Sequence, residues 1–346
     1  MIFAEGKMPE KIWVKLKNTS WVVKSSFGLG VTYVVTVFIL SAVWSSEPAF
    51  FDVAQSASAR AESKNQKVVV GYTTTHTLMA LMQALLEKKG GYLSNDLFFP
   101  GLWMDNMPAW EFGVLVQVRD LARALRKDLS RSQSQSTEDV DLIVAEPLFH
   151  FDSESFWLPD SEGEYRLGLK ALGRYLNRLT NEKDQDAQFY ARADNLHHWL
   201  QDVETRLGSL SQRLSASVGR VSYNVDLAGD TSGQSSTAKP SEIEMRTPWF
   251  EIDDVFYEAR GSSWALLHLL KAVEVDFKDV LEKRNALVSL RQIIRELEAT
   301  QQTLWSPMIL NGSGMGILAN HSLVMANYIS RANAGIVDLR ELLTKG

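Results

Sequence analysis

The chain has 346 residues, of which 45% are hydrophobic, a formal net charge of −6 and no cysteine. This length allows two domains or one large domain with a substantial buried core. The lack of cysteine excludes disulfides, thiolate catalysis, cysteine-ligated zinc and iron–sulfur clusters. The charge is unevenly distributed: residues 1–26 carry five Lys and two Glu, a balance of +3, so the remaining residues sum to −9. Such an acidic body argues against a nucleic-acid-binding face.

An uncharged apolar segment near the N-terminus predicts a transmembrane helix. No Asp, Glu, Lys or Arg occurs between residues 25 and 46, and residues 27–44 read FGLGVTYVVTVFILSAVW. As a helix this segment spans roughly 30 Å, which is the thickness of a bilayer's hydrocarbon core. Trp21 and Trp44 lie near its two ends, where their rings suit the membrane–water interfaces. We therefore expect residues 27–46 to anchor the chain in a lipid bilayer.

The lysines before this anchor predict its orientation. By the positive-inside rule, residues 1–26 form a basic cytoplasmic stub, the anchor crosses a bacterial inner membrane, and residues 47–346 are periplasmic. One alternative is a cleaved signal peptide, but the apolar run exceeds the about 7–15 residues typical of one. An Ala-x-Ala sequence, at residues 57–59, lies well beyond Trp44. The other alternative is a buried helix of a soluble protein. We expect a retained anchor.

Beyond the anchor, the spacing of apolar residues predicts an all-α periplasmic bundle. Residues 47–66 are typical of a linker or frayed helix, and residues 67–72 (KVVVGY) form the one candidate strand. Residues 223–247, rich in Gly, Ser and Thr, predict a loop or linker between a helical subdomain at 67–222 and a helical hairpin at 248–346 that packs on it. The expected helices cover about 73–89, 108–129, 160–179, 189–221, 248–275, 276–304 and 319–343.

Two heptad patterns predict long antiparallel helices that resemble a coiled coil. In the first, apolar residues alternate by four and three positions over almost four heptads. Its members are Phe189, Ala193, Leu196, Leu200, Val203, Leu207, Leu210 and Leu214. The second contains Val280, Leu287, Leu290, Ile294, Leu297 and Leu304. Both patterns are satisfied within one bundle, although a heptad seam can also close between subunits, so a homo-oligomer stays open.

The sequence lacks the common catalytic and cofactor motifs. It contains no GxxxxGK[ST], HExxH, GxSxG or EF-hand loop, so no cofactor is predicted. Asp194, His198 and Asp202 have the spacing of metal ligands on one helical face, but that face points away from the heptad seam and predicts a solvated surface without a metal. His76 is expected to help cap a helix, and His268, between two leucines, to be a hydrogen-bonded core residue.

Two segments combine aromatic and acidic residues. They are FFPGLWMDNMPAWEFG at 98–113 and TPWFEIDDVFYEARGSSW at 247–264, and in each a Pro-Trp or Pro-Ala-Trp opens a helix. Such mixtures form binding sites for carbohydrates, peptides or proteins, and they also form helix-capping loops over a core. Arg260 is expected to accompany Glu258 in an ion pair. The candidate binding residues are Trp103, Asp105, Asn106, Trp110, Glu111, Trp249, Asp253, Asp254, Tyr257, Glu258, Arg260 and Trp264.

The same segments carry a family resemblance. PGLWMDNMPAWEFGVLVQVRD (100–120), LSRSQSQSTEDVDL (129–142), TPWFEIDDVFYEARGSSWALLHLLKAVEVDF (247–277) and LANHSLVMANYISRANAGIVDLRELL (318–343) are similar to a bacterial membrane-anchored family, domain of unknown function 2333. The likeness covers the chain after the anchor. It implies an inner-membrane location, and it brings no catalytic residue.

These observations predict a single-pass membrane protein that is a non-catalytic scaffold or binds a protein partner of the cell envelope. One alternative is a helical sensor that binds a small envelope ligand. Another is an enzyme that acts on an envelope polymer with a carboxylate pair drawn from Glu111, Asp253, Asp254 and Glu258. The enzyme requires two carboxylates in an open cleft, so burial of Glu111 would exclude that residue.

Overall fold

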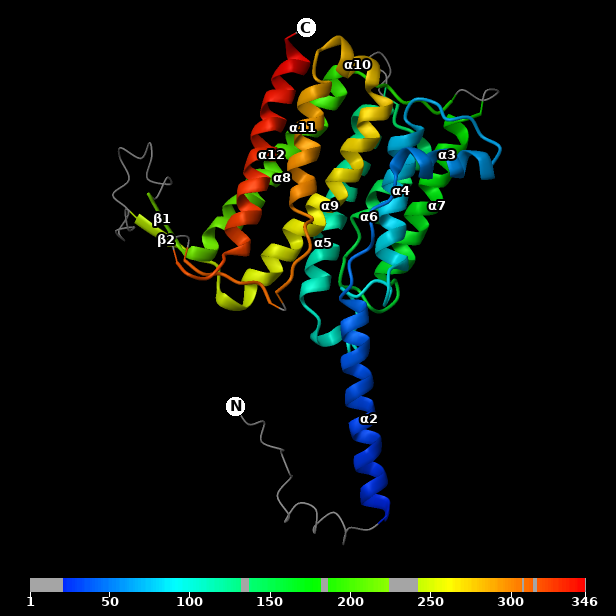
Figure 1. Cartoon of the computed structure of the whole chain (residues 1–346). Coiled ribbons are helices and arrows are strands. Elements are labelled where there is room, and N and C mark those ends of the chain that lie inside the picture. The colour runs from blue at the N-terminus through cyan, green and yellow to red at the C-terminus, as the bar shows by residue number, and fades with distance from the viewer. Residues whose placement is uncertain are drawn as a thin grey trace, which may run out of the picture.

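The structure is a computed structural model that describes residues 21–131, 137–181, 186–223, 242–306, 308–313 and 316–345. It confirms the all-α fold: a helical bundle stands on one long N-terminal helix (Figure 1). That helix, α2, covers Trp21–Trp44. Its segment Val23–Trp44, 22 residues with a mean hydropathy of 2.0, is long and apolar enough to cross a membrane. Residues 1–20 of the expected cytoplasmic stub lie outside the described residues.

The segment between α2 and the bundle, where a linker or a frayed helix was expected, contains an ordered helix. Helix α3 (Val53–Ser63) is capped by Asp52, whose carboxylate accepts a hydrogen bond from the backbone of Gln55, and it buries Ala57 and Ala61. Small residues on one face of α3 allow it to lie close against the bundle, so a polar composition did not indicate a free linker.

The expected strand at 67–72 is wrong. Gly71, with a φ of 88°, turns the chain directly into α4 (Tyr72–Glu87), whose Thr residues lie inside the helix. The strands flank the expected loop at 223–247 instead: β1 (Arg220–Tyr223) begins in the segment that was expected to be helical up to residue 221, and it pairs antiparallel with β2 (Glu242–Met245) inside that loop. Residues 224–241, between them, lie outside the described part of the chain.

Two central helices organise the bundle. Helices α5 (Asn106–Ala124) and α9 (Ile252–Asp276) run side by side through its middle (Figure 1). On one side lie α4, α6 (Val140–Phe149) and α7 (Ser161–Leu179), and on the other α8 (Ala193–Ser215), α11 (Leu287–Ala299) and α12 (His321–Thr344). A π-helical turn, Leu125–Leu129, continues α5.

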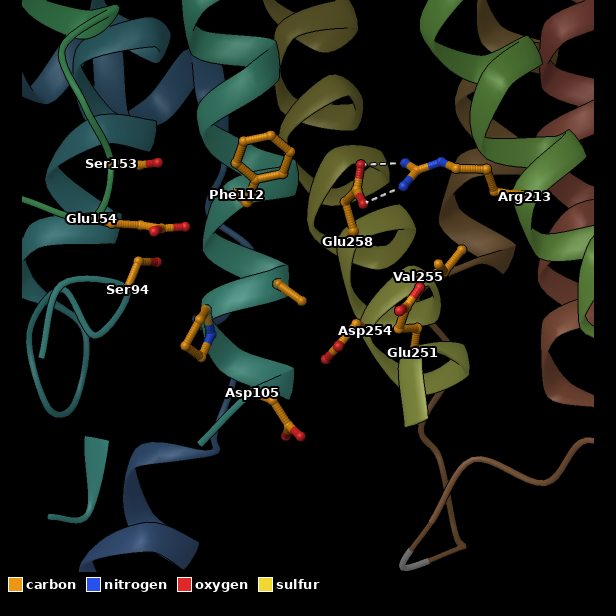
Figure 2. A pocket seen from close by; sticks show the side chains of 12 residues that line it. Ser94, Asp105, Phe112, Ser153, Glu154, Arg213, Glu251, Asp254, Val255 and Glu258 are labelled. Atoms are coloured by element: carbon orange, nitrogen blue, oxygen red, sulfur yellow. Dashed lines mark hydrogen bonds and ion pairs between the residues drawn. The ribbon is translucent and has the colours of Figure 1, made fainter. Parts of the chain in front are cut away.

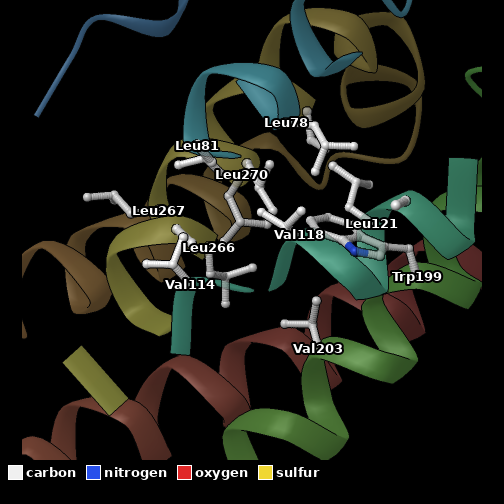
Figure 3. Close-up of a cluster of buried hydrophobic side chains, with 14 of the residues drawn as sticks. Leu78, Leu81, Val114, Val118, Leu121, Trp199, Val203, Leu266, Leu267 and Leu270 are labelled. Atoms are coloured by element: carbon white, nitrogen blue, oxygen red, sulfur yellow. The ribbon is translucent and has the colours of Figure 1, made fainter. Parts of the chain in front are cut away.

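A single apolar cluster holds these helices together. It contains fully buried leucines and valines from α4, α5, α8 and α9 (Figure 3). Because this cluster draws on both sides of the expected boundary at 223–247, the helices before and after that boundary are stabilised by the same buried surface. The division into two subdomains stays a prediction.

The two heptad patterns have different outcomes. The first lies on α8, where its members from Leu196 to Leu214 are buried and face α12. The second does not lie on one continuous helix, because α10 (Lys278–Lys283) ends before α11 begins at Leu287. Asn285, in the left-handed conformation with a φ of 52°, makes this break. The spacing of apolar residues alone does not reveal such a break.

Candidate functional site

Helices α5 and α9 bring the two aromatic and acidic segments together. Their close approach depends on Gly113 and Gly261, because a Cβ atom on Gly113 would overlap the carbonyl oxygen of Glu258, and one on Gly261 would overlap that of Trp110. Next to this crossing, the rings of Trp110 and Trp264 pack with centroids 5.2 Å apart, and both side chains are buried. The glycines and tryptophans of the two segments therefore form the helix interface, and the acidic residues remain at its open end.

An acidic groove opens at the N-terminal ends of α5 and α9. It is a cavity of about 470 Å³ whose wall carries five carboxylates and one arginine (Figure 2). Asp105 is the N-cap of α5, where its side chain accepts a hydrogen bond from the backbone of Asn106. The remaining charged residues of the acidic groove are Glu154, Arg213, Glu251, Asp254 and Glu258.

The single arginine of the acidic groove is already paired. Arg213, from α8, donates through both terminal nitrogens to the two oxygens of Glu258, with Nη1 at 2.8 Å from Oε2. In a bidentate pair of this kind the two charges compensate each other. The other carboxylates of the acidic groove therefore have no cation of their own among the residues that line it.

Asp254 shows the effect of this charge imbalance. Partial burial raises its pKa to about 6, and the neighbouring carboxylates of Asp105, Asp253, Glu251 and Glu258 contribute. Its buried Oδ1 atom has no hydrogen-bond partner among the described residues. Figure 2 shows its side chain directed into the space between α9 and α5. An entering cationic group would supply both the missing charge and the missing donor.

Glu111 is a structural residue. Its carboxylate is completely buried and accepts hydrogen bonds from the backbone nitrogens of Leu93 and Ser94 and from the Ser94 hydroxyl. The buried Lys88 lies 2.7 Å from the same carboxylate. Both oxygens are thus committed to holding the turn after α4. Glu111 cannot act as an acid or base on a substrate in an open cleft.

Arg260 does not pair with Glu258 as expected. Its Nε donates to Glu47, just beyond the anchor, at 2.6 Å, and its terminal nitrogens donate to the backbone carbonyls of Thr300, Gln301 and Gln302. The side chain is only 8% exposed. The expectation failed because Arg260 and Glu258, two positions apart on a helix, point in different directions.

Comparison with known proteins identifies the family. A family model described as an uncharacterized protein conserved in bacteria, DUF2333, matches residues 14–346. The chain belongs to this family. No curated protein and no solved structure matches it. The match confirms the resemblance seen in the sequence, and the family description assigns no activity that could be transferred to the acidic groove.

The remaining aromatic candidates are divided between the core and the surface. Trp103 lies in a short 3₁₀ turn, η1 (Gly101–Trp103), against α2, and Trp249 is exposed in η5 (Trp249–Glu251). Tyr257 is partly buried on α9, which raises its pKa, while Asn106 has a buried Oδ1 without a partner among the described residues. The acidic groove thus collects Asp105, Asp254 and Glu258 from the expected set.

Sequence reasoning missed Glu154, Glu251 and Arg213. Glu251 lies within the predicted segment between aromatic residues, and its position one turn before Asp254 could have indicated it. Glu154 lies in a loop and Arg213 at the end of α8, and nothing in their local sequence marks them. Only the tertiary packing of α8 and the 150–160 loop against α5 and α9 brings them to the acidic groove.

Two of the histidines, His268 and His76, form hydrogen bonds inside the protein. His268 donates from Nδ1 to the carbonyl of Trp264 and accepts at Nε2 from the backbone of Phe51, and burial lowers its pKa to about 4. It is the hydrogen-bonded core residue that the sequence predicted. His76 does not cap α4. Its Nε2 lies 2.9 Å from the hydroxyl of Ser56, and the backbone nitrogen of Thr74 donates to Asp276. In the described ranges, no three His, Asp or Glu side chains are placed to hold a metal ion.

Proposed function

We propose that this chain is a single-pass protein of a bacterial inner membrane whose periplasmic bundle binds a basic segment of an envelope partner protein in the acidic groove, without catalysis. The observation that carries this proposal is the uncompensated charge around Asp254. The orientation, with residues 1–26 in the cytoplasm and 47–346 in the periplasm, follows from the five Lys before the anchor. The bacterial family supports the cellular setting.

The shape and charge of the acidic groove suit a protein segment that carries Lys or Arg. A cation beside Asp254 would lower the pKa of that carboxyl, because it favours the ionised form, and would donate to the unpaired Oδ1 atom. Phe112, which is 41% exposed, adds an apolar wall against which the stem of a long basic side chain can pack. The acidic groove therefore offers both attraction and a contact surface.

The rigid connection between anchor and bundle supports a scaffold. Glu47 is held by Arg260, and the ring of Phe51 stacks on His268 with centroids 4.2 Å apart. These contacts fix the direction in which α2 leaves the bundle. A partner bound in the acidic groove would therefore be held at a defined height above the bilayer, whereas a flexible tether would leave it free to move.

One observation favours an enzyme as a second candidate. A carboxyl group with a pKa of about 6, partly buried among other carboxylates, is a suitable general acid near neutral pH. In that function Asp254 would protonate a leaving group of an envelope polymer. Polymer cleavage by the wild-type protein that is lost in Asp254→Asn would support this second candidate.

A site-specific crosslinker tests partner binding. A photoreactive benzophenone amino acid at Phe112, in the full chain expressed in bacteria, is expected to give one main protein adduct. The variant Glu251→Gln with Asp254→Asn should lose most of that adduct. The control variant Asp279→Asn with Glu282→Gln, which removes the same charge from exposed positions of α10, should retain it.

Three results would contradict parts of the proposal. The absence of any adduct, or an adduct insensitive to the acidic groove's charge, would overturn partner binding there. Stabilisation of the purified chain by a polyamine, without any protein adduct, would support the ligand sensor instead.

The orientation of the chain in the membrane has its own test. Because the chain lacks Cys, a single Val288→Cys variant in spheroplasts reports on which side of the membrane the bundle lies. Failure to react with a membrane-impermeant maleimide would overturn the periplasmic location.

A further inference from the structure

Four uncharged stretches carry many of the strongly exposed aromatic and aliphatic side chains of the bundle. Residues 97–104, 155–159, 247–250 and 299–330 contain no Asp, Glu, Lys or Arg. Each presents large apolar side chains to solvent, and Trp305 is 94% exposed. The most exposed of these side chains are Phe98, Trp157, Leu158, Trp249, Phe250, Trp305 and Ile317. Apolar surface of this extent marks a contact with another apolar phase.

These stretches meet at one end of the bundle. The rings of Phe98 and Phe156 pack with centroids 6.0 Å apart, and the side chain of Asn95 donates to the carbonyl of Ser155 at 3.0 Å. Arg260 joins the carbonyl of Gln302 to Glu47. Figure 1 shows residues 97–104, 155–159 and 247–250, and the described part of the segment between α11 and α12, at the end from which α2 leaves, which we name the anchor end.

Contacts with α2 give the depth of the anchor end. The Nε1 atom of Trp103 donates to the hydroxyl of Ser41 at 3.1 Å, and its ring lies 5.7 Å from that of Phe38. Phe38 precedes Trp44, the last residue of the apolar span, by six residues. At the helical rise this is about 9 Å along α2. The η1 turn therefore lies beside the outer part of the membrane-spanning segment.

Two carboxylates next to the uncharged stretches cap helices of the bundle. Asp105 caps α5, and Asp160 caps α7 by accepting a hydrogen bond from the backbone of Gly163. Both carboxylates follow directly after an uncharged stretch, so they form a polar rim on the bundle side of the apolar tips. Apolar side chains at the tip of a surface, with charged side chains directly behind them, are typical of a protein surface that lies in a membrane interface.

We propose that the anchor end of the bundle is embedded in the headgroup region of the leaflet next to it, with exposed tryptophans and phenylalanines as interfacial anchors. The bilayer is the occupant because the anchor end is continuous with α2: lipids that surround Phe38 also meet Trp103. The bundle is thus attached by its base as well as by its helix. This inference does not depend on what the acidic groove binds.

Single spin labels test this contact. Since the chain has no cysteine, Phe98→Cys, Trp157→Cys, Trp249→Cys and Ile317→Cys each provide one labelling site. The control is Val288→Cys at the start of α11, which is 78% exposed and lies at the opposite end of the bundle (Figure 1). The full chain is placed in nanodiscs of phosphatidylethanolamine and phosphatidylglycerol with one chain per disc, and collision rates with oxygen and with a water-soluble nickel chelate are measured.

The expected result is severalfold lower nickel collision at all four tip sites than at Val288, together with higher oxygen collision. With one chain per disc, a second copy of the chain cannot shield the spin labels from the nickel chelate. Because no other protein is present, a partner protein cannot shield them either. Nickel accessibility at the tips equal to that at Val288 would overturn the proposal. Protection confined to Phe98, whose stretch contacts α2 through Trp103, would also overturn it, because the rest of the anchor end would then lie in water.

Discussion

The guanidinium of Arg260 donates to Glu47 at 2.6 Å, and this bond links the middle of α9 to the first residues beyond the anchor. The same guanidinium donates to three carbonyls at the end of α11. One buried side chain thus joins the anchor, the central helix and the 300–302 turn. Arg260 therefore connects the residues that follow α2 to the centre of the bundle.

Replacing Arg260 should destabilise the protein strongly. In Arg260→Met, Glu47 and the three carbonyls lose their donor, and removal of one partner of a buried ion pair costs about 3–5 kcal/mol. Glu47→Gln should cost less, because the guanidinium keeps its carbonyl acceptors. Thermal unfolding of the full chain in nanodiscs measures both. The control Arg295→Met, at a side chain 80% exposed, should change stability by less than about 0.5 kcal/mol.

The crossing of α5 and α9 predicts opposite effects for two pairs of glycines. Gly113→Ala and Gly261→Ala place a Cβ against a backbone carbonyl, so the helices must separate, at a cost of about 2–4 kcal/mol each. Gly173→Ala and Gly208→Ala meet only side-chain atoms at 3.7 Å and should stabilise their helices by about 0.5–1 kcal/mol. Equal effects in the two pairs, measured by urea unfolding, would contradict the close crossing.

Local patterns in the sequence predicted the local features of the fold. The uncharged run identified α2, and the four-and-three spacing identified the buried face of α8. Each of these features depends on neighbouring residues along the chain.

The features that the sequence could not predict depend on residues far apart in the chain. Arg260 finds Glu47 across 213 positions, and Arg213 reaches Glu258 only because α8 packs beside α9. A carboxylate two residues away in sequence is a closer candidate for Arg260 than one in another segment, yet helix geometry directs the two side chains apart. The break between α10 and α11 likewise depends on one residue, Asn285, in the left-handed conformation, which the spacing of hydrophobic residues does not reveal.

Two buried histidines should make stability fall as the pH is lowered. Burial lowers the pKa of His268 and of His76 to about 4, with Lys271 and Arg60 as further contributors. Between about pH 6.5 and pH 4 these two histidines bind protons in the unfolded chain but not in the folded chain, so their contribution to the free energy of unfolding decreases as the pH falls through this window. The loss should be on the order of 1–3 kcal/mol per histidine and should level off below pH 4.

His268→Phe isolates one of these contributions. The substitution keeps an aromatic ring against Phe51 but removes the titrating group, so the slope of unfolding free energy against pH should become shallower over the same window. The absolute stability should also fall, because the carbonyl of Trp264 and the backbone nitrogen of Phe51 lose their partner. An unchanged slope would show that folding does not lower the pKa of His268.

Asp254→Asn should stabilise the protein at neutral pH. The pKa of Asp254 is raised to about 6, so the folded state prefers the neutral carboxyl and stability is lost as the pH rises from about 4 through 6. Asparagine stays neutral, which means that the variant should unfold at a higher temperature than the wild type at pH 7.5. At pH 4 the difference should shrink, because the wild-type carboxyl is then protonated too. The control Asp279→Asn, at an exposed position of α10, should show no such change between the two pH values. If Asp254→Asn were instead less stable than the wild type at pH 7.5, the Asp254 carboxylate would have a stabilising partner in the acidic groove.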